Sequence, residues 1–194
     1  MTEIEQRFEY LLDRLRTAYD GVGHSSGRPY VYFVYPPDQE RAVRRLADES
    51  FRDGPSLRFH KIDLLELTID SLRDREEQSQ RLLNDPAKRD GAANSILRLW
   101  VRAVGKAIDA AVASPFSPAR PVIVLSGLAA LHPLGNPTSL MEALAESEPR
   151  DPVTNRIVPV VLLVPGVRPP QTSRTYQFLG LKRLELSFYR GEEI

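Results

Sequence analysis

Apolar residues recur at helical spacing in several segments of this chain of 194 residues. The spacing predicts helices over residues 38–53 and 90–113, where Trp100 lies in the middle of a wide apolar face. A further stripe near the start of the chain consists of Ile4, Phe8, Leu11, Leu12 and Leu15. Because an apolar stripe is buried against another layer, we expect Leu12 and Trp100 to be buried in helices that pack on a sheet.

Runs of β-branched and aromatic residues predict five strands. Residues 30–35, 122–125 and 160–164 are apolar throughout, which is typical of strands buried on both faces of a parallel sheet. Residues 57–62 and 184–189 alternate between apolar and polar positions. That alternation predicts half-exposed strands at the two edges of the sheet.

Five strands separated by helices predict an α/β fold, a doubly wound and mainly parallel five-stranded sheet with helices on both faces. Residues 1–194 are the length of one domain, and the polar stretch around 64–90 predicts a helical excursion from it. The order of the central strands does not follow from the sequence.

Charge and composition exclude several classes of function. The chain has 26 Lys and Arg against 26 Asp and Glu, so direct DNA binding through a generally basic surface is not expected. It has no cysteine, which excludes disulfides and Cys-ligated zinc, and its three histidines are scattered, so we expect no metal site. An acidic start and the lack of an apolar run of about 20 residues predict a cytoplasmic protein without a membrane span.

The segment after the first strand argues against a nucleotide site. It reads Tyr35-Pro-Pro-Asp-Gln-Glu40 and has neither the glycines nor the lysine of a phosphate-binding loop. Its prolines remove two N–H donors, and Asp38 and Glu40 would repel phosphate. We therefore expect no cofactor. The layout of the strands resembles a degenerate RecA/AAA-type core that lacks a P-loop, a likeness that concerns the fold alone.

A serine at the end of the strand 122–125 is the one candidate nucleophile. A nucleophile elbow has the pattern G-x-S-x-G, but Val124 and Leu128 occupy the glycine positions around Ser126. The interpretation we favour is a tight turn at Ser126 and Gly127. The alternative is a nucleotide-binding or hydrolytic enzyme with a site near Ser126, His132 and the loop 168–174.

Proline-rich loops at the carboxyl ends of the strands are candidate partner-binding surfaces. The φ angle of proline is already fixed, so such loops lose little conformational entropy on docking, and arginine can bind a carboxylate or phosphate in a bidentate manner. The loops 127–137 and 168–174 fit this description. The candidate residues are Ser126, Gly127, His132, Arg168, Gln171 and Arg174. The basic cluster of Arg41, Arg44 and Arg45 is the alternative surface.

Several short segments of the second half resemble the BrxB family of bacteriophage exclusion (BREX) systems. They are Val-Ile-Val-Leu-Ser-Gly-Leu-Ala-Ala-Leu-His-Pro at 122–133, Pro-Val-Val-Leu-Leu-Val-Pro-Gly at 159–166, Tyr-Gln-Phe-Leu-Gly-Leu at 176–181 and Leu-Ser-Phe-Tyr-Arg at 186–190. Weaker agreement covers Tyr35 to Glu40. The loop 167–174 departs from the family, because it is basic and proline-rich where the family's loop is acidic.

The resemblance implies a small accessory protein that works alongside a DNA methyltransferase, a PglZ-type protein and large ATPases. It therefore implies a non-enzymatic adaptor or scaffold in a phage-defence complex, with the other proteins of that system as its partners. The enzyme alternative near Ser126 and His132 stays open beside it.

Overall fold

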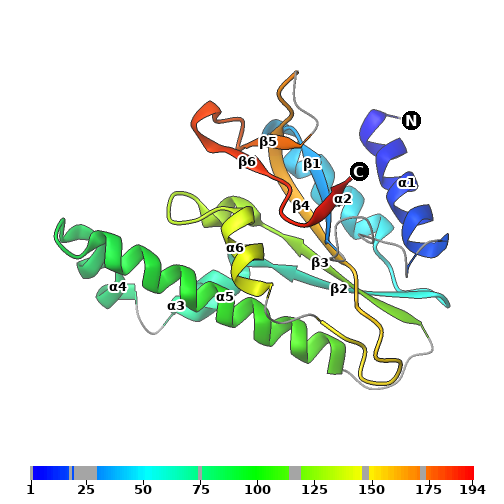
Figure 1. The fold of residues 1–194 in the computed structure, drawn as a ribbon, viewed down its shortest axis with the longest axis horizontal. Coiled ribbons are helices and arrows are strands. Elements are labelled where there is room, and N and C mark those ends of the chain that lie inside the picture. Colours follow the sequence, from blue (N-terminus) through cyan, green and yellow to red (C-terminus); the bar gives the residue numbers. More distant parts are fainter. Residues whose placement is uncertain are drawn as a thin grey trace.

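Five parallel strands form the main sheet of the computed structural model, in the order β2-β3-β4-β1-β7 (Figure 1). The structure describes residues 2–17, 19, 30–73, 76–113, 119–145, 149–170 and 174–194. The strands are β1 (Tyr30–Tyr35), β2 (Leu57–Asp63), β3 (Arg120–Ser126), β4 (Val160–Val167) and β7 (Gly191–Glu193). The predicted α/β class and mainly parallel sheet are confirmed, with 30–35, 122–125 and 160–164 in central strands.

Two short strands extend the sheet beyond the carboxyl end of β4. β5 (Thr175–Phe178) runs antiparallel to the end of β4, and β6 (Glu185–Ser187) runs antiparallel to β5. The strand predicted at 184–189 is therefore at an edge, as expected, but it ends this antiparallel extension and does not form an edge of the parallel sheet. β7 takes that edge instead, parallel to β1. Its sequence, Gly-Glu-Glu, has no apolar pattern from which a strand could be predicted.

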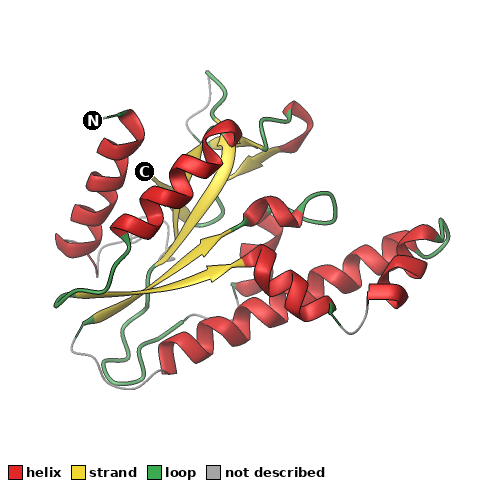
Figure 2. Cartoon of the chain, turned by 180° about the vertical axis from the view of Figure 1, so that it is seen from behind, coloured by secondary structure: helices red, strands yellow, loops and turns green. Residues whose placement is uncertain are grey.

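Helices cover both faces of the sheet (Figure 2). One face packs against α1 (Glu3–Thr17) and α2 (Glu40–Ser50), and the other against α3 (Leu64–Leu72), α5 (Arg89–Ala113) and α6 (Pro137–Leu144). Alternate residues of β1 point to the two layers, so that all six are buried. The 3₁₀ turns are η3 (Pro37–Gln39), η4 (Leu128–Leu131) and η5 (Lys182–Leu184).

Leu12 and Trp100 were the two side chains predicted to be buried, and the prediction is confirmed for Trp100, which is 3% exposed. Leu12 is only partly buried, and its neighbours Leu11 and Leu15 are fully buried instead. The difference arises because the stripe that faces the sheet is centred on Ile4, Phe8, Leu11 and Leu15, which puts Leu12 on its margin.

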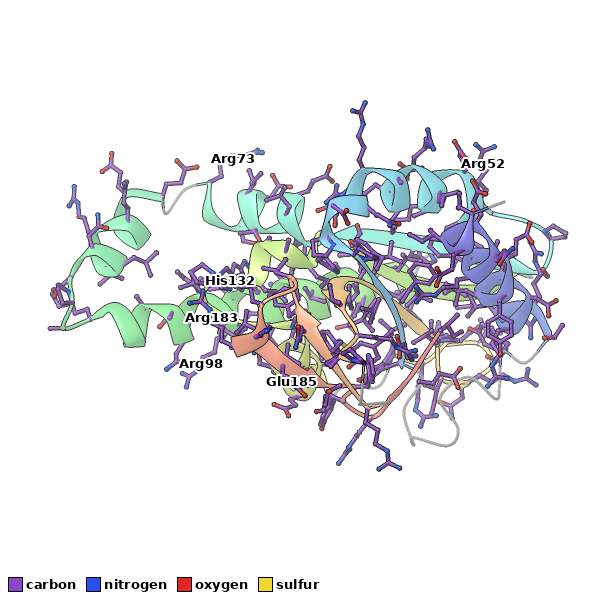
Figure 3. The ribbon with its side chains drawn as sticks, turned by 90° about the horizontal axis from the view of Figure 1, so that it is seen from above. Arg52, Arg73, Arg98, His132, Arg183 and Glu185 are labelled. Atoms are coloured by element: carbon purple, nitrogen blue, oxygen red, sulfur yellow. The ribbon has the colours of Figure 1, made fainter. Side chains whose placement is uncertain are left out.

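The predicted polar excursion at 64–90 contains two helices, α3 and α4 (Glu76–Asn84). α4 packs against α5, and together they project past the sheet (Figures 1 and 3). Within the described ranges, no helix combines the length and the apolar composition needed to cross a bilayer.

Candidate functional site

The connections between strands leave the sheet toward opposite faces at its carboxyl edge. β1 leads into α2 on one face, whereas β2 and β3 lead into α3 and η4 on the other. In open α/β sheets, ligands bind outside the carboxyl ends of the strands at such a reversal. The candidate site therefore lies among the residues that end β1, β2 and β3.

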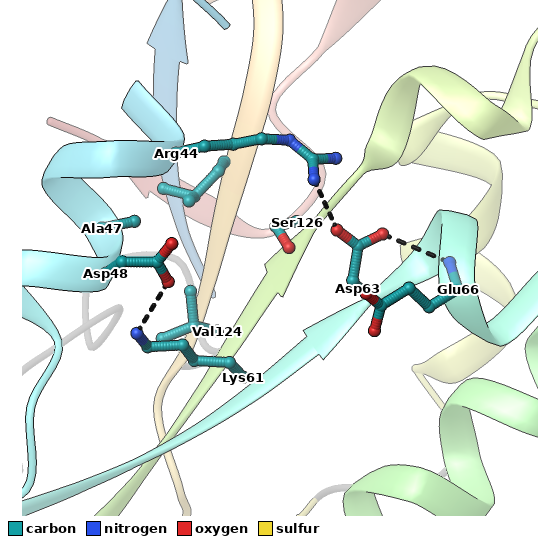
Figure 4. Close-up of a pocket in the computed structure, with 9 residues that line it drawn as sticks. Arg44, Ala47, Asp48, Lys61, Asp63, Glu66, Val124 and Ser126 are labelled. Atoms are coloured by element: carbon teal, nitrogen blue, oxygen red, sulfur yellow. Dashed lines mark hydrogen bonds and ion pairs between the residues drawn. The ribbon is translucent and has the colours of Figure 1, made fainter. Parts of the chain in front are cut away.

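A chain of charged hydrogen bonds runs from the end of β1 to the end of β2. The Tyr35 hydroxyl donates to Glu40 Oε2 at 2.5 Å, and Arg44 Nε donates to Glu40 Oε1 at 2.8 Å. Arg44 Nη1 then donates to Asp63 Oδ2 at 2.8 Å (Figure 4). The bond to Glu40, together with Asp63, raises the pKa of Arg44. Burial, followed by the bond to Glu40, raises the pKa of Tyr35.

Asp63 has a second role as the N-cap of α3. Its Oδ1 accepts a hydrogen bond from the backbone N–H of Leu65 at 2.8 Å, and Glu66 N lies at 3.4 Å. An aspartate at this position satisfies donors that the first turn of a helix leaves unpaired. The side chain is 16% exposed, so one largely buried carboxylate contacts both Arg44 and the start of α3.

A pocket of about 260 Å³ lies beside this carboxylate, between α2 and the ends of β2 and β3 (Figure 4). Lys61 Nζ lies 3.0 Å from Asp48 Oδ1 at its wall. Both lining cations are thus already bonded to carboxylates, since Arg44 is held by Glu40 and Asp63. The lining residues are Arg44, Ala47, Asp48, Lys61, Asp63, Glu66, Val124, Ser126 and Leu163. This excess of carboxylates suits a hydrogen-bond donor or a cation better than a phosphate.

Ser126 and Gly127 form the tight turn predicted for them. Gly127 has a φ of +66°, in the left-handed region. A Cβ there would overlap Asp63 Oδ1 and come within 3.1 Å of Leu65 N. Glycine is thus required for the close approach of β3 to the start of α3.

The structure does not bring Ser126 and His132 together in one pocket. Ser126 pairs with Asp63 in the sheet register and lines the pocket on the α2 face. His132 follows η4, whose leucines Leu128 and Leu131 pack in the core on the opposite face. The pair therefore lacks the contact that a nucleophile and its base require.

Arg168 bonds within the molecule. Its Nε donates to Glu193 Oε2 at 2.7 Å, and Nη2 contacts the same oxygen, which ties the end of β4 to β7. The side chain of Glu193 is only 6% exposed, so Arg168 neutralises a carboxylate that is largely shielded from solvent. The Arg174 side chain is exposed, and Gln171 lies outside the described residues. Of the predicted residues that the structure describes, only Ser126 lines the pocket at the carboxyl edge.

The sequence analysis missed Glu40 and Asp63 as site residues. A usable signal existed for Asp63, because an aspartate that directly precedes Leu-Leu-Glu is a helix N-cap pattern. Arg44 was considered only as one of three basic residues. Arg41 and Arg45 are exposed, whereas Arg44 is turned into the carboxylate cluster.

In the part of the chain that the structure describes, no group of three or more histidine, aspartate or glutamate side chains is arranged to hold a metal ion. The sequence matches no protein-family model and no curated protein, and the fold matches no solved structure.

Proposed function

We propose that this chain is a non-enzymatic adaptor that binds another protein within a BREX-type phage-defence complex. The observation that carries the proposal is the set of bonds at the carboxyl edge, where Arg44 is held by Glu40 and Asp63. A phosphate site needs N–H donors and a cation that faces the ligand. Here Pro36 and Pro37 precede and begin η3, and neither has an N–H to donate. Arg44 on the following helix is already paired with Glu40.

The system to which the adaptor belongs is proposed from the resemblance of the segments at 122–133 and 159–166 to the BrxB family. The proposed partners are the methyltransferase and the PglZ-type protein of that system. The strand order, with β1 between β4 and β7, is compatible with the proposed degenerate RecA/AAA-type core and differs from the 3-2-1-4-5-6 order of dinucleotide-binding sheets.

An exposed apolar pair on α3, the helix whose Glu66 lines the pocket, supports the role in protein binding. Leu65 is 47% exposed and Ile69 is 52% exposed, and they lie one turn apart on α3. We call these two residues the α3 ridge. Single exposed apolar residues are common on surfaces, but two on one helix face, with the exposed Glu66 next to them, match the apolar centre and polar rim of protein interfaces. The exposed Glu66 between them would favour a partner with a basic group at its edge.

The test is affinity purification of the tagged full chain from its host, with the neighbouring genes expressed at their native level. We expect a methyltransferase or a PglZ-type protein to co-purify in a fixed ratio. Purification of the chain alone, at physiological salt and from cells that contain both proteins, would contradict the adaptor function.

Ser126 supports one competing function, because its hydroxyl lines a pocket at the carboxyl end of a parallel strand. The enzyme hypothesis requires saturable binding of ATP with magnesium, or hydrolysis of a generic ester that is lost in Ser126→Ala. The adaptor proposal requires that calorimetry detects no ATP binding at micromolar concentration and that the ester is not hydrolysed.

A further inference from the structure

The outer surface of α5 carries a row of three cations, Arg98, Arg102 and Lys106, each four residues from the next. All three are exposed, and the apolar stripe that contains Trp100 and Val104 lies on the opposite side of the helix. We call these three residues the α5 row. Among the described residues, no ion pair joins any member of the row to a carboxylate.

The α5 row is longer than any other run of cations four residues apart in the described helices, since on α2 the exposed Arg41 and Arg45 are followed by Glu49. Arg44 on α2 pairs with Glu40 four residues earlier, and Arg81 on α4 is likewise paired with Glu77. Such pairs stabilise a helix, whereas like charges four residues apart destabilise it. In the α5 row, Arg98 is followed by Arg102 and then by Lys106 at intervals of four residues, and no carboxylate in the described part of the chain pairs with any of them. The run of positive charge ends at Lys106, because the next exposed charged residue, one turn further along α5, is Asp109.

The spacing of the row fits a line of negative charges. A helix rises about 1.5 Å per residue, so neighbouring members lie about 6 Å apart along the axis and the row spans about 12 Å. One strand of duplex DNA carries a phosphate about every 3.4 Å of axis, so the row spans three or four phosphates. Figure 3 shows that Arg98 points away from the body of the molecule.

The surroundings of the row favour a nucleic acid over a protein. None of the large apolar side chains that are exposed in the described structure belongs to α5, and the exposed neighbours include Asn94 and Ser95. A protein interface has an apolar centre, whereas contact with a phosphate backbone requires none. We propose that the α5 row binds the phosphate backbone of a nucleic acid without reading its sequence. A net charge of zero is no obstacle, because the row is a local patch and does not depend on the total charge.

The test is fluorescence anisotropy of the full chain with a labelled random-sequence 20-bp DNA duplex between 50 and 200 mM salt. Three phosphate contacts give a slope of about −2.7 in a plot of log affinity against log salt, a loss of roughly 40-fold over this range. The triple change Arg98→Gln, Arg102→Gln and Lys106→Gln keeps good helix formers and is expected to abolish this binding. A single-stranded RNA of equal length should show a shallower slope of about −2.1 if it uses the same contacts.

The matched control is Arg16→Gln, Arg52→Gln and Arg73→Gln, which removes the same charge from exposed positions outside α5. This control variant should retain duplex binding. An equal loss in both triple variants would show that total charge and not the row matters, and would overturn the proposal. Binding to polyglutamate without binding to either nucleic acid would assign the row to an acidic protein and overturn the proposal. The absence of nucleic-acid binding at 50 mM salt would overturn it as well.

Discussion

Arg44 and Asp63 join two helices that lie on opposite faces of the sheet. Arg44 projects from α2, and the carboxylate that it contacts at 2.8 Å also caps α3. Because α3 bears the exposed Leu65 and Ile69, this contact positions the proposed protein-binding surface relative to the pocket.

Replacement of Asp63 tests the two roles of its carboxylate. Asp63→Ala should lower the free energy of unfolding by about 1–2 kcal/mol, because it removes an N-cap and an ion pair in which Arg44 is 42% exposed. Asp63→Asn keeps an oxygen that can cap the helix and should lower it by less than about 1 kcal/mol. Urea denaturation measures both, and equal losses in the two variants would contradict the capping role.

A pair of glycine variants tests the contact between Gly127 and Asp63. Gly180 has a φ of +69°, but a Cβ there would meet only Val167 Cγ2 at 3.7 Å. Gly180→Ala should therefore cost about 1 kcal/mol for backbone strain alone. Gly127→Ala has the same strain and also displaces the Asp63 carboxylate, so it should cost at least about 1 kcal/mol more. Equal unfolding midpoints for the two variants would show that the turn does not need this close approach.

His60 should make the protein less stable in mild acid. Burial lowers the pKa of His60, nearby Arg58 lowers it further, and Asp53 partly opposes the shift. The unfolded chain then binds a proton more readily than the folded one, so stability falls as the pH drops below about 6.5. His60→Gln removes this titration and should flatten the plot of unfolding free energy against pH between 7 and 5. An unchanged slope in the variant would assign the acid sensitivity to another group.

Arg168 should stabilise the docking of β7. Arg168→Ala leaves the largely shielded Glu193 carboxylate without this cation, so the amides of β7 should exchange with deuterium faster than in the parent chain. Arg174→Ala removes an exposed arginine near the same loop and should leave exchange in β7 unchanged. Slow exchange in both variants would mean that the backbone pairing of β7 with β1 suffices without the ion pair.

The sequence predicted those parts of the fold that depend on continuous apolar strands. β1, β3 and β4 are buried on both faces, so their composition alone distinguishes them. β7 could not be found in this way, because its two glutamates are held by arginines distant in the chain: Arg14 lies 3.2 Å from Glu192, and Arg168 binds Glu193.

The candidate site was harder to predict than the fold, because it depends on the order of the strands. Arg44 and Asp63 lie 19 residues apart and meet only in the tertiary fold, where β2 pairs with β3, and no local pattern specifies that strand order. Ser126 and His132 show the reverse case. They are close in sequence, but the turn at Gly127 sends the chain to the other face of the sheet.

The adaptor function is tested most directly by changing the α3 ridge and measuring how much partner protein co-purifies. Leu65→Ser with Ile69→Ser removes the exposed apolar pair. The control, Tyr10→Ser with Val153→Ser, removes two side chains that are 59% and 70% exposed elsewhere on the surface. We predict that the ridge variant loses most of the co-purifying methyltransferase or PglZ-type protein, whereas the control retains it and both variants keep the circular dichroism of the parent chain. Undiminished co-purification with the ridge variant, together with its loss in Arg168→Ala with Arg174→Ala, would contradict this account and place the interface on the loop 168–174.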